Sequence, residues 1–353
     1  MDYCNKLKEK QTNRLDQKNL LEFKSIKFQK VFSSSLVTFA PLYMAVFFDI
    51  DHLPRFTNAV LTTGTFDGVH TGHKAILREV VDHAGKVNGE SVLLTFEPHP
   101  RKLLFPNQPL GLITPLHQKL QFIGDTGIQH IVVAPFTKEF ANLSAQEYIE
   151  CFMVHFFHPH SIVIGYDHRF GHDRKGDINL LKQYAPVYNY ELIEIPAQLI
   201  DDAAVSSTKI RNAILDGRMQ DAGHMLGRNY SLTGTVMHGN KLGRTLGYPT
   251  ANLKPTEPEQ IIPANGIYAI HAMHNGNQYN GMLSIGYNPT VTDKKELRIE
   301  ANLFDFDKEI YGENLEIIFV KKLREEQKFP TLGALKQQLD KDKTETMKVM
   351  ING

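Results

Sequence analysis

The chain has 353 residues, a length that favours two domains over a single hydrophobic core. Basic and acidic residues balance at 39 each, so no overall field attracts nucleic acid or an anionic membrane, and a phosphate ligand must be held by local groups. The two cysteines, Cys4 and Cys151, do not suggest a disulfide framework, which favours a reducing, cytoplasmic compartment. No apolar run reaches about 18 residues, which argues against a membrane-spanning helix.

Residues 1–43 differ in character from the rest of the chain. The stretch from Lys6 to Lys30 is polar, rich in Lys, Gln and Asn, and has no sustained apolar period. It is neither a signal peptide nor a convincing transit peptide. Because Met44 begins a natural lead-in to the first strand, we hypothesise an alternative start there and assign no fold to residues 1–43.

The region 44–217 alternates short β-rich runs with helical periods, which is typical of a parallel sheet covered by helices. Helix starts are marked by Thr114-Pro115 and by a capping box from Ser144 to Glu147. In such sheets, ligands bind beyond the carboxyl ends of the strands. The predicted strands are 59–63, 91–96, 130–134, 161–165 and 188–195.

A glycine-rich stretch, LTTGTFDGVHTGHKAIL, joins the first of these strands to a helix. Gly64, Gly68 and Gly72 let the backbone approach a ligand closely, and the helix start offers N–H groups and a positive dipole end. We expect His70 and His73 to point toward the bound anion. The stretch has no G-K-[ST] and no G-x-G-x-x-G, so it is neither a P-loop nor a dinucleotide fingerprint. It predicts a phosphate-binding loop of another kind.

Three further polar segments accompany this loop. Two of them follow predicted strands: Thr95–Arg101 and Gly165–Gly176. In the third, Val205–Arg211, hydroxyl groups can cap a helix, and Lys209 and Arg211 can reach a triphosphate. Their shared position at the carboxyl ends of strands predicts a ligand pocket.

The four segments resemble, in order, the G-x-F-D-G-x-H-x-G-H, F-E-P-H-P, G-x-D-x-x-F-G and S-S-T-x-I-R segments of the adenylyltransferases that make flavin adenine dinucleotide. His168 stands where that family more often carries an aromatic residue. The resemblance implies an α/β nucleotidyltransferase domain with a Rossmann-like parallel sheet, in which His70 and His73 are catalytic. The implied ATP-binding residues are Gly64, Phe66, Asp67, Gly68, Gly72, Ser206, Ser207, Thr208, Lys209 and Arg211. The implied flavin-binding residues are Pro98, His99, Arg101, Asp167, Phe170 and Arg174.

Residues 218–229 read as a short helical linker, and the pattern then changes to closely spaced strands. These predict a second domain, 230–353, built as a small antiparallel barrel. The tetrapeptide His274–Asn277 predicts a hairpin turn, and an amphipathic helix from Thr331 to about Met350 presents Leu332, Leu335 and Leu339 on one face, which we expect to pack on the barrel. The predicted strands are 231–238, 266–273, 278–285, 297–306 and 314–321.

The stretch Gly239–Asn252, GNKLGRTLGYPTAN, is dense in turn formers and basic groups. It resembles the G-R-x-L-G-F-P-T-A-N motif of riboflavin kinases, with Tyr248 in place of phenylalanine. Residues 284–290 and 298–306 resemble two later motifs of that family, with Asn288 where an arginine is more often found. The implied ATP-binding residues are Gly239, Gly243, Arg244, Gly247, Pro249, Thr250 and Asn252.

Phosphorylation of the terminal hydroxyl of riboflavin needs a proton acceptor, a metal ion that neutralises the ATP phosphates, and alignment of the reactants. We expect Glu300, on an inward-facing strand position, to be partly desolvated and to accept the proton. Thr250 and Asn252 offer neutral oxygens to Mg²⁺.

Adenylylation of FMN needs no general base, because the FMN phosphate is already an anionic nucleophile. The protein must align this phosphate with the α-phosphorus of ATP and stabilise the charge that spreads onto pyrophosphate. We expect oriented N–H groups, His70, His73, Lys209 and Arg211 to do this.

The expected protein is thus a bifunctional riboflavin kinase and FMN adenylyltransferase that needs ATP and Mg²⁺ and has small molecules as partners, with no nucleic acid or membrane. One alternative is a nucleotidyltransferase that acts on another phosphate acceptor, such as phosphopantetheine or nicotinamide mononucleotide, but the barrel motifs argue against it. The other is a flavin-binding regulator without catalysis. The presence of both histidines, Thr250, Asn252 and Glu300 counts against that reading.

Overall fold

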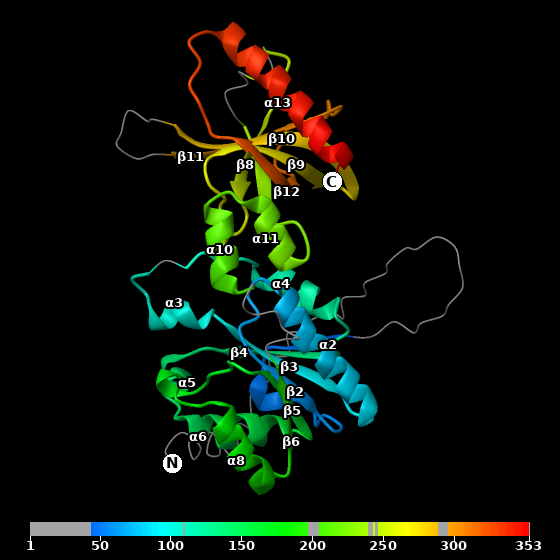
Figure 1. Cartoon of the computed structure of the whole chain (residues 1–353), viewed down its shortest axis with the longest axis vertical. Coiled ribbons are helices and arrows are strands. Elements are labelled where there is room, and N and C mark those ends of the chain that lie inside the picture. The colour runs from blue at the N-terminus through cyan, green and yellow to red at the C-terminus, as the bar shows by residue number, and fades with distance from the viewer. Residues whose placement is uncertain are drawn as a thin grey trace, which may run out of the picture. The chain divides into compact units, whose positions relative to one another are not determined.

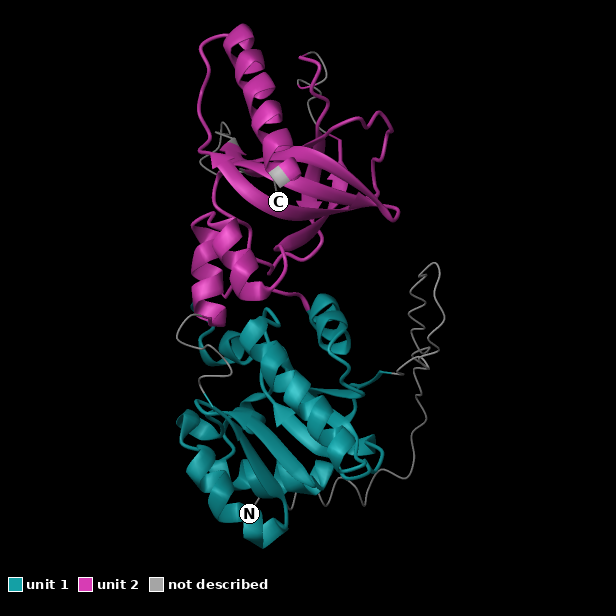
Figure 2. Ribbon diagram, turned by 45° about the vertical axis from the view of Figure 1, so that its right-hand side comes forward, with its two compact units in different colours: residues 1–109, 116–203 teal, residues 110–115, 204–353 magenta. Residues whose placement is uncertain are grey.

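The computed structural model describes residues 44–108, 110–196, 205–238, 243, 246–288 and 296–352. These residues form two compact units, shown in different colours in Figure 2. The first unit contains 44–108 and 116–196, and the second contains 110–115 and the described residues from 205 onward. The segment that opens at Val205 therefore groups with the barrel, whereas the sequence analysis ends the first domain at 217. The functional domain boundaries remain a prediction.

The first unit is built on a six-stranded sheet in which every neighbouring pair is parallel (Figure 1). The strand order is β1-β4-β3-β2-β5-β6. The five predicted strands are confirmed, and β1 adds an edge strand beside β4. The strands are β1 Ala45–Phe47, β2 Val60–Thr63, β3 Ser91–Glu97, β4 His130–Pro135, β5 Ser161–Gly165 and β6 Glu191–Ile195.

Helices bury both faces of this sheet. Leu61 and Leu94 pack with the chain around Phe152 on one face, whereas Val60 and Leu93 pack with α2 on the other. Burial on both sides explains why these strands are continuous apolar runs. The helical segments are η1 Ile50–His52, α2 Thr71–Lys86, α3 Pro100–Leu104, α4 Leu116–Gly124, α5 Lys138–Ala141, α6 Ala145–Glu147, the π-helix η2 Tyr148–Val154, α7 His155–Phe157, η3 His172–Arg174 and α8 Ile178–Tyr188.

The capping box predicted at Ser144 is present. The Ser144 hydroxyl accepts a hydrogen bond from the backbone N–H of Glu147 at 3.2 Å, and the Glu147 carboxylate accepts one from the backbone N–H of Ser144 at 2.9 Å. The two bonds satisfy N–H groups that have no partner inside the helix.

The second unit contains a closed barrel with strand order β10-β11-β8-β7-β12-β9, all of whose paired strands are antiparallel. The five predicted strands are confirmed. A sixth strand, β8, is formed by the last residues of the stretch Gly239–Asn252 and the residues that follow it. The predicted hairpin joins β9 to β10 through Asn275 and Gly276, whose φ angles of 48° and 80° are both positive. The elements are α10 Ser207–Leu215, α11 Met219–Leu226, β7 Ser231–Met237, β8 Ala251–Pro255, β9 Gly266–His274, β10 Asn277–Asn288, β11 Glu296–Leu303 and β12 Asn314–Arg324.

The last helix, α13 Leu332–Asn352, packs on the barrel, and its predicted leucine face makes part of the contact. Leu332 is exposed, whereas Leu339 packs against the cluster of Tyr248, Met282 and Phe304. The buried Asp342 carboxylate pairs with Arg324 of β12, with Nη2 and Oδ2 2.6 Å apart. An ion pair therefore attaches this helix to the barrel in addition to the apolar contact.

Candidate functional sites

The predicted phosphate-binding loop lies at the carboxyl end of β2, where parallel α/β sheets bind their ligands. The N–H of Gly64 donates to the carbonyl of Leu94 in β3 at 3.0 Å. The Phe66 ring folds back over Gly64, where a Cβ atom would lie only 3.1 Å from the ring. Gly68 has a φ of 91°, a conformation that other residues rarely adopt. Close approach at Gly64 and positive φ at Gly68 thus explain two of the three predicted glycines.

His70 and His73 lie together at the start of α2. His70 is the N-cap residue, and its Nδ1 accepts a hydrogen bond from the backbone N–H of His73 at 3.3 Å. The two imidazole rings stack with centroids 3.6 Å apart, and the Phe66 ring meets His73 edge-on at 5.0 Å. The predicted pair therefore forms one packed unit beside the glycine loop.

Lys119 of α4 is a buried cation beside this loop that the sequence analysis missed. Its Nζ donates to the Thr65 carbonyl at 3.3 Å and to the Thr95 hydroxyl at 3.2 Å. Burial lowers the pKa of Lys119, and the nearby Glu97 and Asp67 carboxylates oppose that shift. Lys119 falls on the same helical face as Leu116 and Ile123, so a lysine at an apolar-face position was the available signal.

The loop after β3 carries the predicted flavin contacts Pro98, His99 and Arg101. His99 is buried and caps α3, with its Nδ1 accepting from the backbone N–H of Arg101 at 3.2 Å. Pro98 is exposed, and the exposed Arg101 guanidinium lies 5.9 Å from the centre of the Phe105 ring. Pro98 and Arg101 are thus accessible to a ligand, whereas the nitrogen Nδ1 of His99 is engaged in the cap.

The loop after β5 closes through a backbone pair between Phe170 and Gly176. Phe170, a predicted flavin contact, is only 6% exposed, with its ring 5.3 Å from that of Tyr148, so its ring belongs to the core. Asp167 and Arg174 are exposed at the surface of this loop.

His168 lies in the same loop, with its ring 5.8 Å from the Phe170 ring and 29° from parallel. Its buried Nε2 has no hydrogen-bond partner among the described residues. Burial, which the Asp167 charge opposes, lowers the pKa of His168 to about 4. A neutral imidazole therefore occupies the place where the family more often has an aromatic ring.

The predicted triphosphate segment forms the start of α10 in the second unit. The Ser206 hydroxyl caps this helix by accepting from the backbone N–H of Lys209 at 3.2 Å. Ser207 is half-buried, and Thr208 and Lys209 are exposed. Arg211 is buried, and its Nε donates to the Gly111 carbonyl at 3.0 Å.

In the barrel, Glu300 lies between two neighbouring strands, opposite Asn252 of β8 and Ser284 of β10. Residues paired in this way share a face of the sheet. The Glu300 carboxylate is 3.4 Å from the Arg298 guanidinium, and its side chain is 25% exposed. Burial raises the pKa of Glu300, the Arg298 charge opposes that shift and Glu326 adds to it.

The orientation of Glu300 differs from the expected inward one. Ile299, Ala301 and Leu303 lie in the barrel core, so the alternation of a strand puts Glu300 on the outer face. The expected desolvation is present all the same. Asn252, a predicted oxygen donor, lies opposite Glu300 in the pairing of β8 with β11. The other predicted donor, the half-buried Thr250, precedes Asn252 by two residues.

Two residues of the predicted kinase phosphate loop, Gly239 and Arg244, lie outside the described residues. The side chain of Asn288, in a later motif, also lies outside them. The carbonyl of Gly243 accepts hydrogen bonds from the N–H groups of Leu246 and Tyr248. Gly247, with a φ of 80°, is exposed, as is Pro249. The Pro249 carbonyl accepts from the side-chain amide of Asn302 at 2.7 Å, which ties this segment to β11.

A pocket of about 480 Å³ lies between the end of β12 and α13. Its lining is mostly charged or polar and includes Arg324, Gln338, Asp342 and Lys348. None of the predicted kinase residues is among the described residues that line it.

The two folds define the class of this protein: a parallel α/β unit with a glycine-rich strand–loop–helix segment, followed by a closed antiparallel barrel. The family model for FAD synthetase matches residues 53–209, and that for riboflavin kinase matches residues 226–350. A bifunctional riboflavin kinase/FMN adenylyltransferase from Listeria monocytogenes is 38% identical over 82% of this chain and 91% of the relative. The protein of the same name from Escherichia coli is 33% identical over 80% of this chain and 90% of its own. The chain therefore belongs to the family of bifunctional riboflavin kinase/FMN adenylyltransferases.

A solved structure from Streptococcus pneumoniae, of a protein named as a macrolide-efflux protein, matches with a TM-score of 0.79 and 33% identity, over 86% of this chain and 98% of that one. The likeness shows that the two proteins share a fold. In the described part of this chain, no helix has the length and apolar character needed to cross a membrane.

Proposed function

We propose that this chain phosphorylates riboflavin to FMN with ATP and then joins FMN to AMP, giving FAD and pyrophosphate. The observation that carries the proposal is the presence of both site types on one chain: the stacked histidines at the phosphate loop and the half-buried Glu300 beside Asn252. Membership of the bifunctional family supports it and disfavours another phosphate acceptor, for which a kinase barrel would have no use. We place the enzyme in the cytoplasm, in keeping with its few cysteines.

In the kinase step, Glu300 accepts the proton of the terminal riboflavin hydroxyl. The oxygen of that hydroxyl bonds to the γ-phosphorus of ATP, and ADP leaves. The raised pKa of Glu300 suits a group that must take a proton. Thr250 and Asn252 fit Mg²⁺ as neutral oxygen donors beside the Glu300 carboxylate, because this ion prefers oxygen ligands. When bound, the ion neutralises charge on the ATP phosphates.

In the adenylylation step, a phosphate oxygen of FMN attacks the α-phosphorus of ATP, and pyrophosphate leaves. The N–H groups at the start of α2, together with His70 and His73, stabilise the phosphate charge. Lys119 positions the loop by holding the Thr65 carbonyl and the Thr95 hydroxyl. Lys209 and Arg211 bind the triphosphate of ATP. The flavin nucleotide is bound by the exposed residues Pro98, Arg101, Asp167 and Arg174.

The test is a time course in which the purified chain is incubated with riboflavin, ATP and Mg²⁺ and the products are separated. We expect FMN to form first and FAD with pyrophosphate to follow, and FMN supplied directly to be converted to FAD. A folded protein that binds flavin without producing FMN or FAD would instead support the regulator. Product from phosphopantetheine or nicotinamide mononucleotide, with none from FMN, would support the other acceptor.

A further inference from the structure

A cluster of metal-ligating side chains lies at the amino-terminal edge of the parallel sheet, away from the phosphate loop. Ser161 and Glu191 are the first residues of β5 and β6 and lie opposite each other in the register. His160 immediately precedes β5, and His83 comes from the last turns of α2. Since α2 begins beyond the carboxyl end of β2 and runs back along the sheet, His83 lies about 15 Å along the helix axis from His73.

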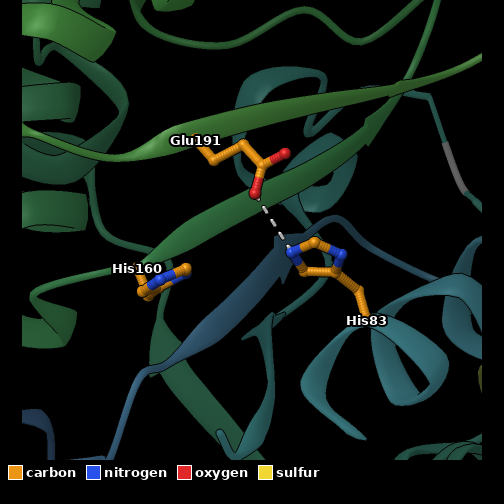
Figure 3. Close-up of side chains that lie close together, drawn as sticks. All are labelled: His83, His160 and Glu191. Carbon is orange, nitrogen blue, oxygen red and sulfur yellow. Dashed lines mark ion pairs between the residues drawn. The ribbon is translucent and has the colours of Figure 1, made fainter. Parts of the chain in front are cut away.

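The side chains of His83, His160 and Glu191 turn toward a common point (Figure 3). One ligand atom from each lies within 4.8 Å of the others. The His83 Nε2 is 3.3 Å from the Glu191 carboxylate and 3.0 Å from the Ser161 hydroxyl, which in turn is 2.8 Å from the His160 Nδ1. Ser161 is fully buried, and its hydroxyl lies within hydrogen-bond distance of both histidines.

We propose that His83, His160 and Glu191 bind a zinc ion, a site separate from both transfer reactions. Two imidazole nitrogens and one carboxylate oxygen form a donor set typical of Zn²⁺, whereas Mg²⁺ and Ca²⁺ prefer oxygen alone. Tetrahedral zinc with bonds of about 2.0–2.2 Å holds its ligands about 3.3–3.6 Å apart. The exposed His160 and Glu191 side chains can close the remaining distance by rotation, while His83 is held by packing, its side chain 12% exposed.

The ion would act as a structural clamp. It would tie the end of α2 to β5 and β6, segments that are far apart in the sequence. The phosphate loop stands at the opposite end of α2, so the clamp would fix the helix that carries His70 and His73 without touching the reacting groups. Without an ion the same side chains form an ion pair and hydrogen bonds to Ser161, and that arrangement is the competing explanation.

Zinc titration of the full-length protein distinguishes the two. After treatment with a chelator and its removal, we expect the protein to bind one Zn²⁺ at this site and its Tm to rise by about 5 °C or more at saturating zinc. Co²⁺ in place of zinc should give the visible absorption of a tetrahedral cobalt–imidazole site. The His83→Gln and His160→Gln variants should each bind zinc at least tenfold more weakly and lose most of the Tm increase.

The matched control is His158→Asn, which removes an exposed imidazole two residues from His160. Asparagine tolerates the left-handed backbone at this position, where φ is 42°. This variant should keep the full zinc response. FAD formation by every variant reports that the fold is intact and is independent of the zinc result. The proposal is overturned if the wild-type protein shows no zinc-dependent Tm increase, or if the His160→Gln variant, altered only at an exposed side chain, keeps the wild-type response.

Discussion

The imidazole rings of His70 and His73 stack at 3.6 Å with their planes 17° apart, yet the two histidines have different structural duties. His70 is 5% exposed and caps α2 through its Nδ1, which must be unprotonated to accept the hydrogen bond from His73 N–H. The His73 side chain makes no part of this cap. Catalytic and structural contributions can therefore be separated by substituting each residue in turn.

Substituting His73 with alanine should reduce FAD formation from FMN by about 10²-fold or more, because a donor to the phosphate charge is lost. FMN formation should remain largely intact, since Glu300 and the other predicted kinase residues belong to the other unit, which has its own core. Separate assays with riboflavin and with FMN measure the two steps. Equal loss of both activities would argue for a single shared site or for unfolding.

Substituting His70 with alanine should reduce FAD formation and also lower the free energy of unfolding by about 1 kcal/mol, because the N-cap is removed. The His70→Asn variant is the control, since asparagine is a favoured N-cap residue. It should restore stability without restoring activity. Recovery of activity with asparagine would mean that His70 acts only through the cap.

Substituting Glu300 with glutamine should slow the kinase step by about 10²- to 10⁴-fold while FMN adenylylation continues. The amide keeps the shape of the side chain but cannot take the proton, so the loss should appear in kcat more than in nucleotide affinity. Riboflavin phosphorylation at the wild-type rate would exclude Glu300 as the base.

The pKa of Glu300 adds a pH test. Burial raises this pKa, so the wild-type kinase rate should fall as the pH drops through a value above the ordinary 4.5 of a glutamate. Stability has the opposite dependence: the contribution of Glu300 is present in full below the unfolded pKa and is lost as the pH rises through the folded one. The Glu300→Gln variant should thus unfold at the same Tm or a higher one at neutral pH, which excludes unfolding as the cause of lost activity.

Substituting Lys119 with methionine should slow FAD formation by about 10- to 100-fold and leave riboflavin phosphorylation unchanged. Methionine keeps the apolar stem but loses the hydrogen bonds to the Thr65 carbonyl of the loop and to the Thr95 hydroxyl of β3, and bonds from a charged donor are worth about 1.5–3 kcal/mol. Lys102→Met, on helix α3, provides a comparison in which another lysine of the same unit is replaced by methionine. An unaltered rate for Lys119→Met would limit this lysine to a packing role.

Substituting His168 with phenylalanine should keep FAD formation within about threefold of wild type, because the imidazole is already neutral at pH 7 and lies against Phe170. The folded pKa of about 4 lies below the ordinary 6.5, so the unfolded chain takes up the proton first and stability falls as the pH drops from about 6.5 to about 4. The phenylalanine variant should lose less stability over this range, as measured by Tm. A Tm that depends on pH in the same way in both proteins would contradict the assignment.

Some features follow from the sequence because neighbours in the chain determine them. Gly68 and the Asn275-Gly276 turn need positive φ angles, and Ser144 and Glu147 cap one another across a single turn. The alternation of short β-rich runs with helical periods was sufficient to predict the parallel sheet. The change to closely spaced strands after residue 229 was sufficient to predict the barrel. The roles of the individual site residues remain predictions.

Other features were decided only by the tertiary structure, because they join residues that are remote in the sequence. The partners of Lys119 come from the glycine-rich loop and from β3, and the outward orientation of Glu300 depends on which residues of β11 the barrel encloses. The pattern around His83, His160 and Glu191 contains no metal-binding motif, and these side chains meet only because β5 pairs with β6 beside the end of α2. Local backbone conformation and capping are determined within a few residues, whereas strand order and register determine which distant side chains share a site.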